Sequence, residues 1–163
     1  MPRNDPSPPY DPQQHRLYEW ERAFVESKTP GAVMSRQETQ ELARRASGLL
    51  GIREPRIRFL PLNVSCRANM RTHEIEIADW GRTKPTLLHE IGHLATIREV
   101  MAGDAPHGKA FLSTVIALYA RFIPLPIDYL IETAVFRGLI LDEPRARGPI
   151  GNETREGFFP GVL

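Results

Sequence analysis

The feature that most constrains this chain is His89-Glu90-Ile91-Gly92-His93, which places two histidines four residues apart. On a helix, side chains at this spacing lie about 40° apart around the axis, so both imidazoles can reach one metal ion. Glu90 follows the first histidine directly and can contact a metal-bound water without binding the metal itself. Gly92 leaves room for close packing of another element. The residues around the motif are apolar, which predicts a buried and rigid metal helix: Leu87, Leu88, Ile91, Leu94 and Ala95.

A catalytic zinc site uses three protein ligands and keeps one position open, so a third ligand is needed. His107 is the strongest candidate, because it stands between a short loop and the start of a predicted helix. A helix N-terminus disfavours imidazolium and would keep His107 neutral and able to bind metal. Asp104 could cap that helix or accept a hydrogen bond from His107. His73, Asp104 and the glutamates of the last predicted helix stay open as alternative ligands.

Three further side chains could stabilise a developing oxyanion, and the sequence does not decide between them. Tyr119 and Tyr129 carry hydroxyl donors suited to this task. Tyrosines on apolar helices are, however, more often core residues with one hydrated end. His73 is the third candidate, and it shares the face of a predicted strand with Ile75 and Ile77.

The composition indicates one globular domain with no marked preference for a charged partner. The chain has 163 residues, 21 Lys and Arg against 20 Asp and Glu, and a net charge of +1. A nucleic-acid-binding protein usually has a clear basic excess. The single cysteine, Cys66, excludes a disulfide within the chain and a Cys-rich zinc ribbon. No apolar run approaches the ~20 residues of a membrane span, and residues 1–14 lack the core of a secretory signal, so we expect a cytoplasmic protein without a membrane partner.

Local signals place the folded region at residues 14–142, between two tails. Residues 1–13 hold five prolines and predict a disordered lead-in, and residues 143–163 predict a loose tail. Ser35 and Glu38 form a capping box that should begin a helix ending at Gly51. The remaining helices are expected at residues 14–26, 85–98, 108–122 and 127–141, with a loop at 99–106.

Alternating polar and apolar residues predict two short strands, at residues 56–60 and 72–77. Residues 62–70 are ambiguous and could hold another short strand. Helices together with a small sheet in a single domain indicate the α+β fold class.

The paired motifs resemble the SprT-like branch of the zincins, whose pattern is HExxH followed by HGxxF. His107-Gly108 with Phe111 matches the second motif. The chain is more similar still to a family of short bacterial and phage zinc metallohydrolases, which also carries a strand before the metal helix and a Tyr-x-Trp-Glu stretch. That stretch is matched here by Tyr18, Trp20 and Glu21. The resemblance covers roughly residues 14–142.

The resemblance implies a compact zincin-like (minigluzincin) domain, a small sheet packed on helices with the HExxH helix beneath its edge strand. It also implies that His89, His93 and His107 bind Zn²⁺ and that Glu90 is the general base. Many SprT-like proteins carry a Cys-rich zinc ribbon after the catalytic domain, and this chain does not.

The leading hypothesis is therefore a zinc-dependent hydrolase, in particular a metallopeptidase that cleaves amide bonds in a protein or peptide. Zinc would lower the pKa of its water toward ~7, and Glu90 would take the proton and return it to the leaving amine. An extended substrate would pair with an edge strand above the site, which residues 73–77 could provide.

Two alternatives stay open. A zinc hydrolase acting on a nucleic acid or a small amide would be favoured by a basic patch around the cleft. A regulatory or binding module with a structural metal would be favoured by a fourth protein ligand. The arginines that could form such a basic patch are Arg44, Arg45, Arg53, Arg56 and Arg58.

Overall fold

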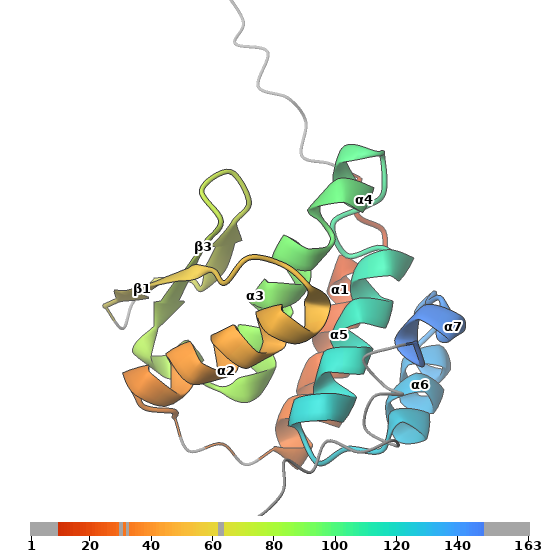
Figure 1. Ribbon diagram of the computed structural model, residues 1–163. Helices are drawn as coiled ribbons and strands as arrows, with labels where there is room; N and C mark the ends of the chain where they lie inside the picture. Colours follow the sequence, from red (N-terminus) through yellow and green to blue (C-terminus); the bar gives the residue numbers. More distant parts are fainter. Residues whose placement is uncertain (1–9, 30, 32, 62–63, 149–163) are drawn as a thin grey trace, which may run out of the picture.

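The computed structural model describes residues 10–29, 31, 33–61 and 64–148, and the fold is α+β, as predicted. A three-stranded sheet and α2 lie on one side of α3, and α1 and α5 lie on its other side (Figure 1). The α-helices are α1 (Gln14–Trp20), α2 (Arg36–Leu50), α3 (Lys84–Ala95), α4 (Ile97–Met101), α5 (Lys109–Phe122), α6 (Ile127–Phe136) and α7 (Glu143–Ala146). Among the described residues, no helix has the length and apolar character needed to cross a membrane.

The sheet has the order β1-β3-β2, so β3 is its central strand. The strands are β1 (Arg56–Leu60), β2 (Arg67–Asn69) and β3 (Glu74–Ala78). β3 runs parallel to β1 and antiparallel to β2. Ile75 and Ile77 are fully buried, as the alternating pattern predicted. β2 resolves the ambiguous stretch and forms an edge of the described sheet.

His73 does not belong to the strand in which it was expected. Its backbone has φ 56°, in the left-handed region that non-glycine residues seldom adopt. Because of this conformation the extended backbone starts only after His73, so β3 begins at Glu74, two residues after the predicted start at Thr72.

The first helical segment begins where predicted, but its inward face is different. The helix continues from α1 into a π turn, η1 (Glu21–Val25), and a 3-10 turn, η2 (Glu26–Lys28). Leu17 and Trp20 are fully buried, whereas Ala23, expected on the same face, is exposed. The wider π turn directs Glu21 and Val25 inward instead.

Several predicted boundaries are corrected. The capping box at Ser35 and the left-handed Gly51 are present, as predicted. The metal helix stops at Ala95, and α4 occupies part of the expected loop. The last predicted long helix ends at Phe136, because Gly138 turns the chain with φ 70°. Residues 143–146 form α7 rather than a loose tail, and the rest of that tail beyond residue 148 lies outside the described residues.

The segment before α1 is packed against distant parts of the chain, although it was predicted to be disordered. Gln13 is buried, and its side-chain amide donates to the backbone oxygens of His107 (2.9 Å) and Ile140 (3.2 Å). The backbone N–H of Ile140 donates to Gln13 Oε1 in return (2.7 Å). Residues 10–13 therefore belong to the folded domain, and residues 1–9 lie outside the described part of the chain.

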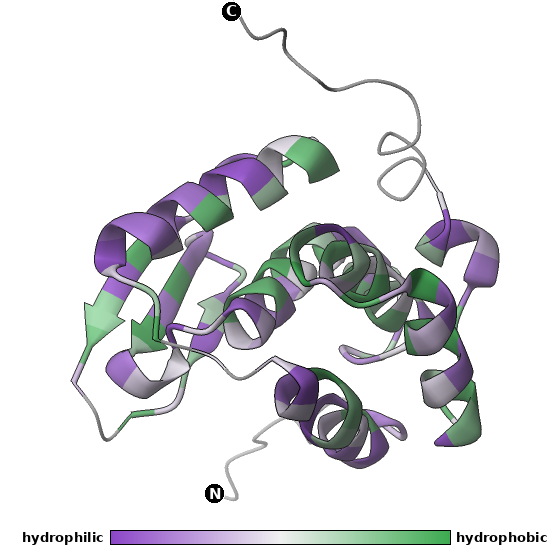
Figure 2. Cartoon of the chain, turned by 90° about the horizontal axis from the view of Figure 1, so that it is seen from below, coloured by the Kyte–Doolittle hydropathy of each residue, from purple (hydrophilic) through white to green (hydrophobic). Residues whose placement is uncertain are grey.

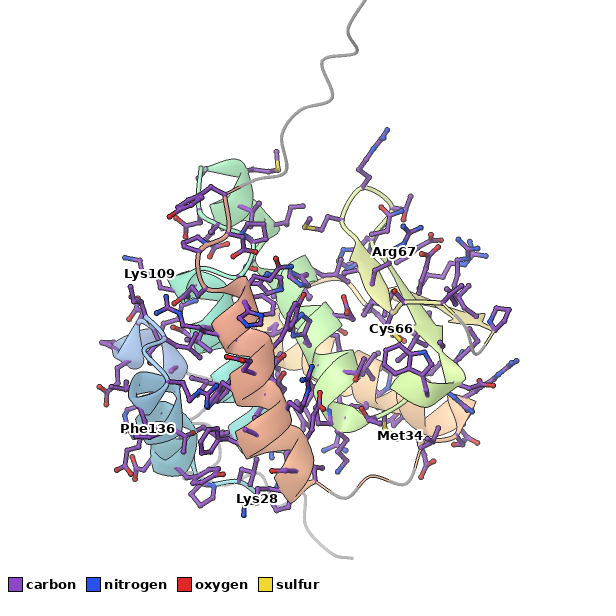
Figure 3. All side chains as sticks on the ribbon, turned by 180° about the vertical axis from the view of Figure 1, so that it is seen from behind. Lys28, Met34, Cys66, Arg67, Lys109 and Phe136 are labelled. Carbon is purple, nitrogen blue, oxygen red and sulfur yellow. The ribbon has the colours of Figure 1, made fainter. Side chains whose placement is uncertain are left out.

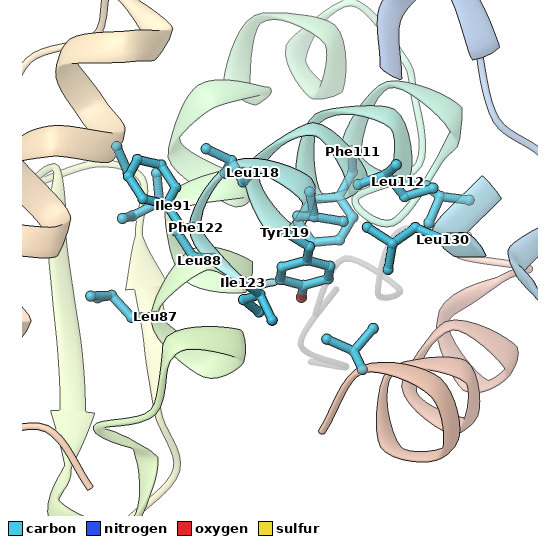
Figure 4. Packing of buried hydrophobic residues seen from close by; sticks show 14 of the residues in the cluster. Leu87, Leu88, Ile91, Phe111, Leu112, Leu118, Tyr119, Phe122, Ile123 and Leu130 are labelled. Carbon is cyan, nitrogen blue, oxygen red and sulfur yellow. The ribbon is translucent and has the colours of Figure 1, made fainter. Parts of the chain in front are cut away.

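The core is centred on the contact between α3 and α5. Figure 4 shows Leu88 and Ile91 of α3 near Leu118 and Phe122 of α5. Gly92 makes this close approach possible, because a Cβ built there would lie 2.5 Å from Val115 Cγ1. Figure 2 shows the hydrophobic colour on the central helices and the hydrophilic colour on the outward face of α2.

Candidate metal centre

Three histidines from two places in the sequence converge at one point. His89 and His93 project from α3, and His107 lies immediately before the N-cap of α5. One ring nitrogen from each histidine lies within 4.8 Å of the others. The Nε2 atom of His89 is 3.2 Å from that of His93 and 3.4 Å from that of His107. The three residues predicted as ligands are thus placed where they could hold one metal ion.

Two carboxylates fix the orientation of two of these imidazoles. His89 Nδ1 donates to Glu21 Oε1 (2.9 Å), and His107 Nδ1 donates to Asp11 Oδ2 (2.6 Å). A carboxylate can only accept, so each Nδ1 carries the hydrogen and each neutral ring presents the lone pair of Nε2. Two such lone pairs facing each other repel unless a cation lies between them. The donor set therefore fits a metal ion, and carboxylate–histidine pairs of this kind are common around bound metals.

The electrostatic environment differs among the three rings. Burial lowers the pKa of His93 to about 2, and the neighbouring His89 and His107 add to this effect. Burial also lowers the pKa of His107, although Asp11 partly opposes it. For His89, burial acts in the same direction, but the charge and hydrogen bond of Glu21 outweigh it and raise the pKa. A carboxylate that stabilises an imidazolium also stabilises an imidazole bound to a dication.

Phe111 holds the three rings from the side of α5. Its ring stacks on His93 with centroids 4.4 Å apart. Its centroid lies 4.9 Å from those of His89 and His107, in edge-on contacts. Phe111 is the last residue of the HGxxF motif, so this motif supplies both a candidate ligand and the side chain that packs against all three.

A cleft opens beside the histidines, and Glu90 lies in its wall. Burial raises the pKa of Glu90, opposed by the charge of His89 and by a hydrogen bond from the backbone of Ala68. Figure 3 looks onto this side of the molecule, with α1 in front and Cys66 labelled toward the sheet. The cleft has a volume of about 210 Å³ and is lined by Tyr18, Glu21, Glu26, Cys66, Trp80, Pro85, Thr86, His89, Glu90 and Tyr119.

Of the three residues predicted as candidates for oxyanion stabilisation, only Tyr119 lines the cleft. Tyr119 lines the cleft, but its hydroxyl donates to Glu21 Oε1 (2.6 Å). Tyr129 donates to the backbone of Phe24 and does not line the cleft. His73 bonds to the backbone oxygen of Arg53 and is likewise outside the cleft, so it is also excluded as a third metal ligand.

Tyr18 carries a further hydroxyl that could stabilise an oxyanion, and the sequence did not point to it. Its oxygen lies 3.3 Å from His107 Nε2, and its ring centroid lies 5.6 Å from that of His89. Tyr18 lines the cleft and is 40% exposed. Its hydroxyl is therefore close to the point where the three histidines converge, on the side open to the cleft.

Two predictions about neighbouring residues are wrong. Asp104 neither accepts a hydrogen bond from His107 nor caps α5, whose N-cap is Gly108 without a side-chain cap bond. Asp11 takes the position beside His107, because the ring turns toward the segment before α1. The strand above α3 is β2, not residues 73–77, because β3 is paired on both sides.

The basic patch that would favour a nucleic-acid substrate is not found around the cleft among the described residues. Arg44 pairs with Glu41, Arg58 pairs with Glu76, and none of these four residues lines the cleft. Within the part of the chain that the structure describes, neither a lysine nor an arginine lines the cleft. The five arginines proposed for the patch are located instead on α2 and around β1: Arg44, Arg45, Arg53, Arg56 and Arg58.

Comparison of the chain with protein-family models, with curated proteins and with solved structures finds no match. The similarity to SprT-like zincins therefore stays a hypothesis that rests on the two motifs.

Proposed function

We propose that this protein is a zinc-dependent hydrolase, and in particular a metallopeptidase. The observation that carries the proposal is the convergence of three Nε2 atoms beside a cleft that also contains Glu90. Among the described residues, the ligand group contains no fourth His, Cys, Asp or Glu. A site with three protein ligands and an open position is typical of catalytic zinc, whereas structural zinc usually has four protein ligands.

We infer zinc from the histidine ligands together with the neighbouring Glu90, because the ligand type alone does not select one metal. Imidazole nitrogen suits zinc, copper, iron and nickel. Three neutral imidazoles next to a buried glutamate form the combination that zinc hydrolases use for activating water. Elemental analysis of the purified protein tests this choice directly.

The chain's own residues supply the proton transfers. Zinc, when bound, polarises the substrate carbonyl and makes water more acidic. Glu90 accepts the proton of the attacking water and passes it to the leaving amine. Its raised pKa brings the carboxylate closer to neutrality, which suits a group that must both take and give a proton. Tyr18 is placed to donate a hydrogen bond to the oxygen on which negative charge develops.

A peptide is the substrate that the surroundings favour. β2 is an edge strand of the described sheet and packs on α3, so an extended chain could pair with it near Glu90. A nucleic acid is disfavoured, since the described lining of the cleft holds three carboxylates and neither lysine nor arginine. A purely structural metal is disfavoured by the lack of a fourth ligand among the described residues.

Glu90→Gln is the decisive variant. It removes the proton acceptor and leaves the three histidines in place, so zinc content and melting temperature should stay near wild-type values. Cleavage of denatured casein by the zinc-loaded protein should fall by about 10²–10⁴-fold, mostly in turnover. Tyr18→Phe should lower turnover by roughly 10²-fold with zinc retained.

Glu132→Gln is the matched control, because Glu132 is exposed on α6 and does not line the cleft. Its activity should equal that of the wild type. Full activity of Glu90→Gln with zinc bound would show that Glu90 is not the base.

A further inference from the structure

The cleft beside His89 is large enough for one side chain rather than for a whole ligand. Its volume of about 210 Å³ is below the roughly 300–1,000 Å³ of sites that enclose a complete small molecule. Pro85 and Thr86, one helical turn before His89 and Glu90, form part of its wall. The cleft therefore has the dimensions of a subsite, which holds one part of a substrate that extends beyond it.

Three carboxylates make this subsite negative, and one of them is neither bonded to another side chain nor assigned to the proposed reaction. Glu21 already accepts hydrogen bonds from His89 and Tyr119. Glu90 is the base in the proposed reaction. Glu26 is the third carboxylate in the wall and is exposed at its rim. Within the described part of the chain it forms no ion pair and no side-chain hydrogen bond. A charged group in this position is available to a ligand.

The surroundings of Glu26 favour a cationic partner. Burial and the neighbouring Glu21 raise its pKa, and Arg22 opposes this only in part. A cation in the cleft would relieve this repulsion between carboxylates. Trp80, also in the wall, is held by a hydrogen bond from its indole N–H to the backbone of Val64. Indole rings attract guanidinium and ammonium groups through their faces.

We propose that this cleft is a specificity subsite for a cationic side chain, arginine or lysine, next to the bond that is cleaved. Glu26 supplies the negative charge that selects it, and Trp80 supplies an aromatic wall. The inference rests on the proposed peptidase function, since it assigns the cleft to part of a peptide substrate.

The test compares two probes that differ only in charge. Acetyl-arginine hydroxamate and acetyl-citrulline hydroxamate have side chains of nearly the same shape, and their hydroxamates bind zinc. Calorimetric titration of each into zinc-loaded wild-type protein should show about tenfold tighter binding of the arginine probe. Glu26→Gln should reduce this preference to less than about twofold, and Glu132→Gln should keep it.

Equal affinity for the two probes, or a preference that survives in Glu26→Gln, would overturn the subsite. Binding of neither probe to the zinc-loaded protein would also overturn it, because the cleft would then not adjoin an accessible metal. The casein assay is scored separately. Casein cleavage without a charge preference overturns the subsite and leaves the peptidase function standing. A Glu26-dependent preference without casein cleavage overturns the assignment of the cleft to a peptidase substrate and leaves only a cation-selective cleft beside the metal.

Discussion

Asp11 and Glu21 orient the imidazoles of His107 and His89 so that their Nε2 atoms face the centre of the site. Neither carboxylate could be identified as a histidine partner from the local sequence. The spacing of His89 and His93 is a property of one helix, so their convergence was predictable. Asp11 is separated from His107 by 96 residues and Glu21 from His89 by 68, and local patterns do not encode such pairings. Glu21 was marked only by the Tyr-x-Trp-Glu resemblance.

The unequal pKa values of the histidines predict how zinc affinity depends on pH. The pKa of His89 is raised, whereas those of His93 and His107 are lowered. As the pH falls through the pKa of His89, one proton competes with the metal, while the other two rings stay neutral. The dissociation constant for zinc should therefore rise by about tenfold per pH unit just below that pKa.

Competition titrations with a chromophoric chelator between pH 5 and 8 would measure this slope. Glu21→Gln should move the onset to lower pH, because it removes the carboxylate that raises the pKa of His89. A slope of two or three protons near neutral pH would contradict the assignment.

At the scale of elements, the two ends of α2 were predictable, whereas the ends of α3 and α6 and the π turn were not. Ser35 and Gly51 act through their own backbone and nearest neighbours, so their signals are local. The π turn at residues 21–25 depends on distant contacts, in particular the hydrogen bonds that Glu21 accepts from His89 and Tyr119. The helical pattern alone therefore placed Ala23 on the wrong face.

Gly92→Ala should damage both the α3–α5 contact and the metal centre. The added Cβ would meet Val115 Cγ1 at 2.5 Å and Phe111 Cε2 at 3.0 Å. Val115 cannot move aside easily, since a β-branched side chain on a helix has one preferred rotamer, and Phe111 packs on the three imidazoles. We expect a loss of about 1–3 kcal/mol in the free energy of unfolding and weaker zinc binding.

Gly48→Ala is the control, because Gly48 lies in α2 and its Cβ would meet nothing within 4 Å. It should stabilise the protein by roughly 0.5–1 kcal/mol. Urea unfolding and zinc titration distinguish the two variants. A Gly92→Ala protein as stable as wild type would show that the helices can separate at no cost.

At the scale of the whole molecule, the sequence predicted the α+β class but not the order of the strands. β2 has only three residues and lies in a stretch without clear alternation. Because β2 pairs with β3, β3 is the central strand, and the sequence of β3 alone does not reveal this second partner. The folded region also extends beyond the predicted limits at both ends, because buried Gln13 and Ala146 belong to it.

The apolar core should keep the protein folded without metal. It joins buried residues from α1, α2, β3, α3, α5 and α6, and most of these do not touch the histidines. Removing zinc with a chelator should lower the melting temperature by about 10 °C, the shift expected from a tightly bound ligand in a domain of this size. Circular dichroism should still report a helical, cooperatively unfolding protein, whereas a random-coil spectrum would indicate a structural metal.

The packing of residues 11–21 also bears on the order in which the fold assembles. Asp11, Gln13 and Glu21 leave the ribosome early, but their partners His89, His107 and Ile140 are synthesised much later. The histidines can gather on α3 and α5 before this segment docks, yet their carboxylate partners arrive only when the early and late parts of the chain meet. We therefore expect the ligand set to acquire its final hydrogen bonds late in folding, so that a nascent or misfolded chain would hold a metal ion less firmly than the finished protein.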